Sequence, residues 1–324
     1  HPELAEPLAE ILEESYGLII YQEQVMAIAQ KVAGFSLGQA DILRRAMGKK
    51  KKSELDKQYA GFAAGMTERG FGEGAVKALW DILLPFSDYA FNKAHSAAYG
   101  LVSYWTAYLK AHYPAEYMAA LLTSVGDSKD KMALYLNECR RMGIKVLPPD
   151  VNASGYRFEP VQDEHFAKGK PPRTMRYGLG AVKGTGQGAV EEILRARAAG
   201  GAFQNLFDFC RRVDKHAVNR RTVEALIRAG AFDTIEPNRA ALLGSIGTAM
   251  EAAEQAARSA NQVSLFGDDS SDVVASELAK VAPWNLHAKL TEEKAALGYY
   301  FSGHLFDHWR DEVRRIVAGA LCGG

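Results

Sequence analysis

A short polar segment ahead of a long apolar run carries residue types that bind anions. Within five residues it offers an amide, an ammonium group, an imidazole and a hydroxyl: Asn92, Lys93, His95 and Ser96. The apolar run that follows, residues 99–113, predicts a buried helix with Ser96 as its N-cap. The first N–H groups of a helix lack internal partners and carry partial positive charge, so this segment suits a phosphate. An ordinary capped helix with a solvated polar lead-in is the alternative.

Two adjacent arginines offer a second group of cations. Ser36 and Gln39 have the spacing of a capping box, which predicts the start of a helix that contains both arginines. Adjacent helical residues point about 100° apart, so Arg44 and Arg45 are not expected to share one salt-bridge face. They can instead grip different oxygens of one polyphosphate. The lysine run that begins at Lys49 is also explained by solvated cations that offset the helix dipole.

A glycine-rich turn before a helix is the third candidate. Such glycines let the backbone approach a phosphate, with N–H groups as donors and a lysine as the charge. The segment resembles the hairpin of the helix-hairpin-helix family, which grips nucleic-acid backbone, although Thr185 stands where that family prefers an aliphatic residue. A plain glycine-rich connection is the alternative, and a second, degenerate copy is expected at residues 225–232. The residues expected at the nucleic acid are Lys183, Gly184, Thr185, Gly186 and Gly188.

Two large apolar side chains stand in a polar linker rich in Asp and Ser. They are Leu265 and Phe266, preceded by Gln262. A short extended segment that presents Leu and Phe to a partner's pocket is a common mode of recognition. The alternative is that the two side chains fold back on their own domain.

The composition is that of an ordinary globular chain. Its 324 residues are 48% hydrophobic and 24% charged, and the formal net charge is zero, so the total charge gives no sign of nucleic-acid binding. The three cysteines form no C-x-x-C pair, which favours a reduced, cytoplasmic compartment. No uninterrupted apolar segment is long enough to span a bilayer. The start at His1 suggests a piece of a longer protein.

The hydrophobic periodicity divides the chain. It is helical almost throughout from Leu4 to about Gly143, and then changes. Short strands are expected at residues 144–147, 156–158 and 175–177. We place a domain boundary near residues 148–155. The expected fold is therefore mainly α, with a few short β-strands.

Several longer motifs, in the same order along nearly the whole chain, closely resemble the alpha subunits of bacterial DNA polymerase III, a C-family replicative polymerase. The motifs are residues 17–26, 43–50, 91–99, 109–116, 147–150, 177–184 and 228–233. The resemblance implies part of a DNA-directed DNA polymerase, which performs template-dependent nucleotidyl transfer. It assigns four segments: a helical fingers domain (1–150), a tandem helix-hairpin-helix domain (151–260), a clamp-binding peptide with its linker (261–275) and the start of a following segment (276–324).

The resemblance also implies roles for single residues. One group matches the family's surface that faces the incoming nucleotide and its triphosphate: Arg44, Arg45, Lys49, Asn92, Lys93 and His95. The glycine-rich turn matches the hairpin that holds duplex DNA, and Gln262, Leu265 and Phe266 match the peptide that binds the sliding clamp. The implied partners are template–primer DNA, dNTP, the sliding clamp and other replicase subunits, with no membrane.

The metal site of the implied reaction is expected elsewhere. Phosphoryl transfer needs Mg²⁺ held by carboxylates, and the family's catalytic aspartates lie in a palm domain upstream of this segment. The chain contains no Asp-x-Asp pair, so the Mg²⁺ ligands of the intact enzyme are expected outside it, and the chain alone is expected to be inactive. A non-catalytic DNA-binding adaptor tethered to a sliding clamp is the alternative function. An error-prone paralogue of the same family is a third possibility.

Overall fold

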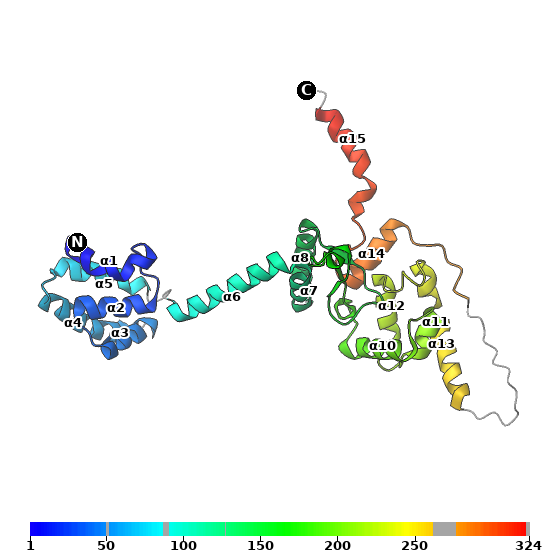
Figure 1. Ribbon diagram of the computed structural model, residues 1–324, viewed down its shortest axis with the longest axis horizontal. Helices are drawn as coiled ribbons and strands as arrows, with labels where there is room; N and C mark the ends of the chain where they lie inside the picture. Colours follow the sequence, from blue (N-terminus) through cyan, green and yellow to red (C-terminus); the bar gives the residue numbers. More distant parts are fainter. Residues whose placement is uncertain (50–51, 87–90, 127, 262–276, 322–324) are drawn as a thin grey trace. The chain divides into compact units, whose positions relative to one another are not determined.

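The computed structural model describes residues 1–49, 52–86, 91–126, 128–261 and 277–321 (Figure 1). The chain forms two compact units, His1–Thr106 and Ala107–Gly324. Helices dominate both units and a three-stranded sheet lies in the second, which confirms the prediction of a mainly α fold. Across the described ranges, every helix is too short or too polar to cross a lipid bilayer.

The first unit is a helical bundle around a buried core. Its helices are α1 (Ala5–Leu12), α2 (Gln22–Ala33), α3 (Leu37–Lys49), α4 (Lys52–Glu68) and α5 (Glu73–Phe86), with the 3-10 turns η1 (Pro2–Leu4) and η2 (Glu13–Ser15). α2 packs against α1, α3 and α4. The residues at the spacing of one helical face are buried, as the periodicity predicts: Val25, Ile28, Ala29 and Val32.

Glutamine side chains fix the starts of α2 and α3. The predicted capping box is present, because Gln39 N donates to Ser36 Oγ over 3.3 Å and Ser36 N donates to Gln39 Oε1 over 2.8 Å. At α2, the buried Gln24 accepts from the backbone N–H of Tyr21 and donates to Ser15 Oγ, over 2.9 and 2.7 Å. The direction in which the chain enters α2 is therefore held by a buried side chain.

The long helix α6 (Lys93–His112) forms where the apolar run predicts, but none of its residues is buried. Tyr99 is 61% exposed and Trp105 54% exposed. Neither buried core includes a side chain of this helix. The prediction of a buried helix was therefore right about the helix and wrong about its burial. An apolar run favours a helix, but it does not determine which other part of the protein packs against that helix.

The second unit surrounds another buried core, which extends from α7 to α14. Its elements are α7 (Pro114–Ser124), α8 (Lys129–Arg141), β1 (Lys145–Leu147), β2 (Glu159–Val161), α9 (Glu164–Ala167), β3 (Thr174–Arg176), η3 (Leu179–Ala181), α10 (Gln187–Gly200), α11 (Leu206–Arg212), α12 (Arg220–Ala229), α13 (Arg239–Asn261), α14 (Leu286–Leu297), η4 (Leu305–His308) and α15 (Arg310–Leu321). α11 and α12 both pack on α13, and α12 also packs on α14. The unit is thus mainly helical, and the three strands of its sheet come before α10 in the sequence.

The sheet has the strand order β1–β3–β2, with β1 parallel and β2 antiparallel to β3. Two predicted strands lie within one residue of their expected positions, but residues 156–158 are not a strand. They bond elsewhere, because Gly180 N donates to Tyr156 O over 3.0 Å and Phe158 N donates to Thr123 Oγ1 over 3.1 Å. β2 begins only at the next residue.

The packing does not divide the chain at residues 148–155. β1 lies before that range and pairs with β3 after it, and α7 shares the buried core with both sides. The two compact units instead divide between Thr106 and Ala107. The functional assignment of the segments stays a prediction.

Arg239 joins three helices of the second unit through a buried ion network. Its side chain is 4% exposed and donates to both carboxylate oxygens of Asp233 over 2.7 and 2.6 Å. The same guanidinium donates to Glu293 and to the carbonyl of Arg228, each over 3.0 Å. Glu293, 1% exposed, also accepts from N and Oγ of Ser302 over 2.9 and 3.0 Å.

The aromatic residues after α14 complete this packing. Tyr299 and Phe301 lie against the buried Tyr177, with ring centroids 6.5 and 5.8 Å apart. Burial raises the pKa of Tyr177 to about 12. The segment at residues 298–304, whose sequence has no evident chemistry, therefore has a packing role.

Substitutions of two neighbouring glutamates measure how much the buried ion network contributes to stability. Glu293→Ala leaves Arg239 with one carboxylate partner in a buried site, so we expect a loss of about 3 kcal/mol or more in the free energy of opening of the second unit. Glu292 forms a half-buried ion pair with Arg228 at 3.1 Å, so Glu292→Ala should cost less than Glu293→Ala, on the order of 1 kcal/mol. Native-state hydrogen exchange of the α12 and α14 amides measures both. Equal losses in the two variants would contradict the structural role of Arg239.

Candidate functional site

The polar segment before α6 caps that helix in a way that the sequence did not predict. His95 N donates to Asn92 Oδ1 over 2.8 Å, so Asn92 is the N-cap and the helix begins at Lys93. Ser96, the predicted N-cap, lies inside the helix and donates from Oγ to Asn92 O over 3.1 Å. Lys93 and His95 therefore belong to the first turn of α6, whose N–H groups have no acceptor within the helix itself.

Backbone pairing places the start of α6 beside the start of α2. Gln22 N donates to Phe91 O over 2.9 Å, and Phe91 N donates to Ile20 O over 3.2 Å. Tyr21 and Phe91 form the corresponding parallel bridge. Two helix N-termini that are 70 residues apart in sequence thus meet in the first unit.

Two glutamates bind the positive groups at this junction. Glu23 accepts from Lys93 N with both carboxylate oxygens, over 3.1 and 3.0 Å, and from Asn92 Nδ2 over 3.0 Å. The ammonium group of Lys93 donates to Glu14. The hydrogen bond that Lys93 donates to Glu14 raises the pKa of Lys93 above its usual value. The junction therefore already pairs its N–H and ammonium donors with carboxylates of the chain.

The two adjacent arginines share one partner, contrary to the expectation from the sequence. Arg44 donates to Asp41 Oδ1 from Nε and Nη2, over 2.9 and 2.7 Å, and Arg45 pairs with Asp41 Oδ2 at 2.8 Å. The hydrogen bond from Arg44 lowers the pKa of Asp41. Arg44 also donates to Gln22 Oε1 over 3.3 Å. Gln22 is the residue before Glu23, so the structure brings Arg44 and the start of α6 to the same turn of α2.

His95 and Lys49 are the two remaining predicted nucleotide contacts. His95 is exposed, and its ring stacks at 4.4 Å on Tyr99. Lys49 is the last residue of α3, and its side chain lies outside the described part of the chain.

The glycine-rich turn forms an open loop at the start of α10. Gly184 has φ +83°, in the left-handed region that favours glycine, and Thr185 N donates to Val182 O over 3.0 Å. A Cβ added at Gly186 or Gly188 would meet nothing within 4 Å. Gly186 is the N-cap of α10 and provides no side-chain acceptor for the first-turn N–H groups.

The side chains of this loop separate into one that is buried and one that is exposed. Thr185, the departure from the family's aliphatic residue, is 5% exposed, and its Oγ1 has no hydrogen-bond partner among the described residues. Lys183 is exposed, while its backbone N donates to Ala296 O over 2.9 Å at the end of α14. The loop is therefore anchored through its backbone and leaves its lysine at the surface.

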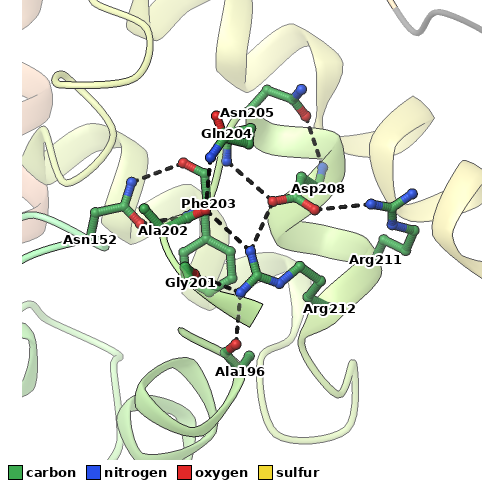
Figure 2. A network of polar contacts seen from close by, with 10 residues as sticks. All are labelled: Asn152, Ala196, Gly201, Ala202, Phe203, Gln204, Asn205, Asp208, Arg211 and Arg212. Carbon is green, nitrogen blue, oxygen red and sulfur yellow. Dashed lines mark hydrogen bonds and ion pairs between the residues drawn. The ribbon is translucent and has the colours of Figure 1, made fainter. Parts of the chain in front are cut away.

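Arg212 fixes the opposite end of α10 (Figure 2). Its Nη2 donates to the carbonyls of Ala196 and Gly201, each over 2.7 Å, and its guanidinium stacks on the Phe203 ring at 4.4 Å. Asp208 pairs with Arg212 at 3.0 Å. These contacts satisfy carbonyls at the C-terminal end of α10 and lock that helix to α11.

An asparagine adds a second tie to the same loop. Asn152 donates to Phe203 O over 2.9 Å and accepts from Phe203 N over 2.7 Å, a bidentate pairing with the backbone (Figure 2). Because both ends of the α10–α11 connection are held, the orientation of α10 and of the hairpin at its start is fixed.

The predicted second hairpin at residues 225–232 does not present an open turn. Gly230 ends α12 with φ +84°, and an added Cβ there would lie 2.2 Å from the Arg239 side chain. The residues that follow, Ala231 and Phe232, are fully buried. The buried ion network of Arg239 therefore closes this turn from the surface.

Sequence reasoning missed a different helical connection, between α11 and α12. Asn219 caps α12 by accepting from Thr222 N over 3.1 Å, and exposed cations surround the cap: Lys215, Arg220 and Arg221. The Asn219 cap followed by the apolar spacing of α12 was a local signal that could have located it.

Two further expectations have no structural counterpart to describe. The predicted clamp peptide, Gln262, Leu265 and Phe266, lies outside the described residues. Within the described ranges, no group of three or more His, Cys, Asp or Glu side chains is placed to hold a metal ion.

Comparisons with known proteins match both parts of the chain. Residues 1–70 match the bacterial DNA polymerase III alpha subunit finger domain, and residues 143–242 match the helix-hairpin-helix motif. The chain is similar to proteins named DNA polymerase III subunit alpha: 50% identical over 311 residues in Mycobacterium tuberculosis (94% of the chain, 25% of the relative), 49% over 316 residues in Neisseria meningitidis (97% and 27%) and 44% over 318 residues in Escherichia coli (97% and 27%). It spans about a quarter of the length of these relatives.

Proposed function

Because this chain belongs to the family of bacterial DNA polymerase III alpha subunits, we propose that it is part of a replicative, DNA-directed DNA polymerase. The similarity along 94–97% of the chain carries the proposal. In the intact subunit, the first unit binds the incoming nucleotide, the second binds duplex DNA, and the linker after α13 binds the sliding clamp. The Mg²⁺ of the reaction is held by residues outside this chain, so the chain alone is inactive.

The junction of α2 and α6 supports the nucleotide assignment. It gathers cations and helix N-termini from segments far apart in sequence: Arg44 through Gln22, and Lys93 and Asn92 through Glu23. Backbone N–H groups at a helix start and flexible cations are the donors that a triphosphate requires. Arg45 and His95 are exposed, so such a ligand can reach both side chains, and at Arg45 it competes with Asp41.

The nucleotide assignment predicts a kinetic effect in the complete alpha subunit. Arg45→Ala and His95→Ala should each lower kcat/KM for dNTP incorporation about tenfold or more, because each removes a positive group at the triphosphate. Steady-state incorporation on a primed template measures it. Lys77→Ala is the matched control, since Lys77 is an exposed lysine of α5 that pairs with Asp81 of the same helix. Unchanged incorporation in both site variants would refute the assignment.

The open turn before α10 supports the duplex-binding assignment. Unoccupied space above Gly186 and Gly188 lets a phosphate approach the backbone, and Lys183 adds a cation. Contacts of this kind bind the phosphate backbone and carry no sequence information.

Two variants separate close approach from charge at the hairpin. Gly188→Leu fits the open space and favours the helix, yet it should weaken duplex binding about tenfold by blocking hydrogen bonds to a phosphate. Lys183→Ala should reduce the salt slope of binding by about one. Fluorescence anisotropy with labelled duplexes of two sequences measures both effects. The control is Lys168→Ala, at the residue directly after α9. Tight binding by Gly188→Leu would overturn the hairpin assignment.

The clamp assignment is tested separately. Phe266→Ala removes the large apolar side chain of the proposed peptide, so the complete subunit should lose at least about tenfold in affinity for a sliding clamp. Val263→Ala, at a variable position of the same peptide, is the control. Surface plasmon resonance on an immobilised clamp gives both affinities. Retained binding by Phe266→Ala would remove this part of the proposal and leave the other two parts intact.

A further inference from the structure

The proposed triphosphate donors of the first unit already hold anions that belong to the chain. Both carboxylate oxygens of Glu23 accept from the first N–H of α6, and Asn92 donates to the same carboxylate. The Lys93 ammonium group pairs with Glu14. A carboxylate on helix N–H groups and a second one on a lysine reproduce the contacts that two neighbouring phosphate groups would make.

We propose that Glu14 and Glu23 are internal substitutes for a polyphosphate, and that a polyphosphate binds at this junction by displacing Glu14 from Lys93. The inference rests on the proposed nucleotide-binding function and adds a regulatory device to the same site. It makes Glu14 a competitor of the ligand. Lys93 is thus paired with an anion both before and after the ligand binds: first with Glu14, then with the polyphosphate.

The exposure of the Lys93–Glu14 pair permits this exchange. The two side chains are 49% and 45% exposed, so neither is locked by packing, and an exposed ion pair is weak enough to be replaced. The pair borders an open groove of about 570 Å³ on the first unit, which both glutamates line. A ligand can therefore reach Lys93 from the groove without unfolding any element.

The two glutamates differ in what their removal would disturb. Glu23 ties the start of α6 to α2, so its loss also affects the local fold. Glu14 contacts only the side chain of Lys93 among the bonds that define the junction, and α6 keeps its Asn92 cap and its Glu23 contact without it. Glu14 is therefore the position at which competition can be measured apart from folding.

The exchange also makes the site selective for multiply charged ligands. A monoanion that replaces Glu14 gains about as much from Lys93 as the carboxylate does, so it gains little net free energy. A polyphosphate brings several charges and acceptors, so it can replace Glu14 at Lys93 and still offer oxygens to further donors of the junction. The inferred ligand class is thus a polyphosphate, such as the triphosphate of a nucleotide or inorganic triphosphate.

The complete alpha subunit provides the test, with inorganic triphosphate as a competitive inhibitor of dNTP incorporation. Glu14→Gln keeps the size of the side chain and removes its charge, so the inhibition constant for inorganic triphosphate and the KM for dNTP should each fall about two- to fivefold. Glu10→Gln is the matched control. Glu10 lines the same groove but pairs with Lys31 at 2.6 Å, so this variant should leave both constants unchanged.

A double-mutant cycle with Lys93→Ala distinguishes the possible results. The inference requires that Lys93→Ala weakens triphosphate binding and that it abolishes the gain from Glu14→Gln. If Lys93→Ala weakens binding but Glu14→Gln brings no gain, the competition is refuted and the nucleotide site stands. If Lys93→Ala and Arg45→Ala both leave binding unchanged, the nucleotide site itself is refuted. A gain from Glu14→Gln that persists without Lys93, or an equal gain from Glu10→Gln, would also overturn the inference.

Discussion

The carboxylate of Glu23 joins the starts of two helices, and the candidate site of the first unit depends on this junction. It lies in the first turn of α2 and accepts from the first N–H of α6, at Lys93. A negative charge is favourable at a helix N-terminus because of the macrodipole. The single carboxylate of Glu23 lies at the N-termini of both α2 and α6. Pairing of Gln22 with Phe91 holds the backbones together, and Arg44 reaches the same turn through Gln22.

Two arginines have a comparable positioning role in the second unit. Arg212 closes the C-terminal end of α10, and Arg239 joins α13 to α14 and to the turn after α12. Each guanidinium satisfies several carbonyls or carboxylates, which offsets the desolvation of a charge that is largely buried. As a result the C-terminal end of α10 is occupied by protein contacts, whereas its positive N-terminal end stays open. The end of α10 that stays open is thus the end with partial positive charge, which favours an anion.

The sequence predicted features that depend on near neighbours and missed those that depend on distant ones. The helices, the capping box of α3 and the open turn at Gly184 follow from local spacing and from φ. The start of α6 does not, because an acceptor 69 residues away, Glu23, contributes to its cap at Asn92. The sequence analysis did not expect Arg44 and Arg45 to pair with the same residue. On a helix, however, the residues three and four positions after Asp41 both lie next to it, so one aspartate can pair with two adjacent arginines. The exposure of α6 depends on surfaces that a helical pattern does not encode.

The two candidate sites present their positive groups in opposite electrostatic states. In the first unit Lys93 pairs with Glu14, and both arginines pair with Asp41, so an incoming anion competes with resident carboxylates and gains only the difference between two interactions. At the hairpin, Lys183 has no ion-pair partner within the described residues, and the N–H groups at the start of α10 face open space. An anion there adds interactions without displacing any, and salt screens that gain directly. Competition favours a ligand of matched charge and geometry, as proposed for the first unit, whereas addition favours any phosphate backbone, as proposed for the hairpin.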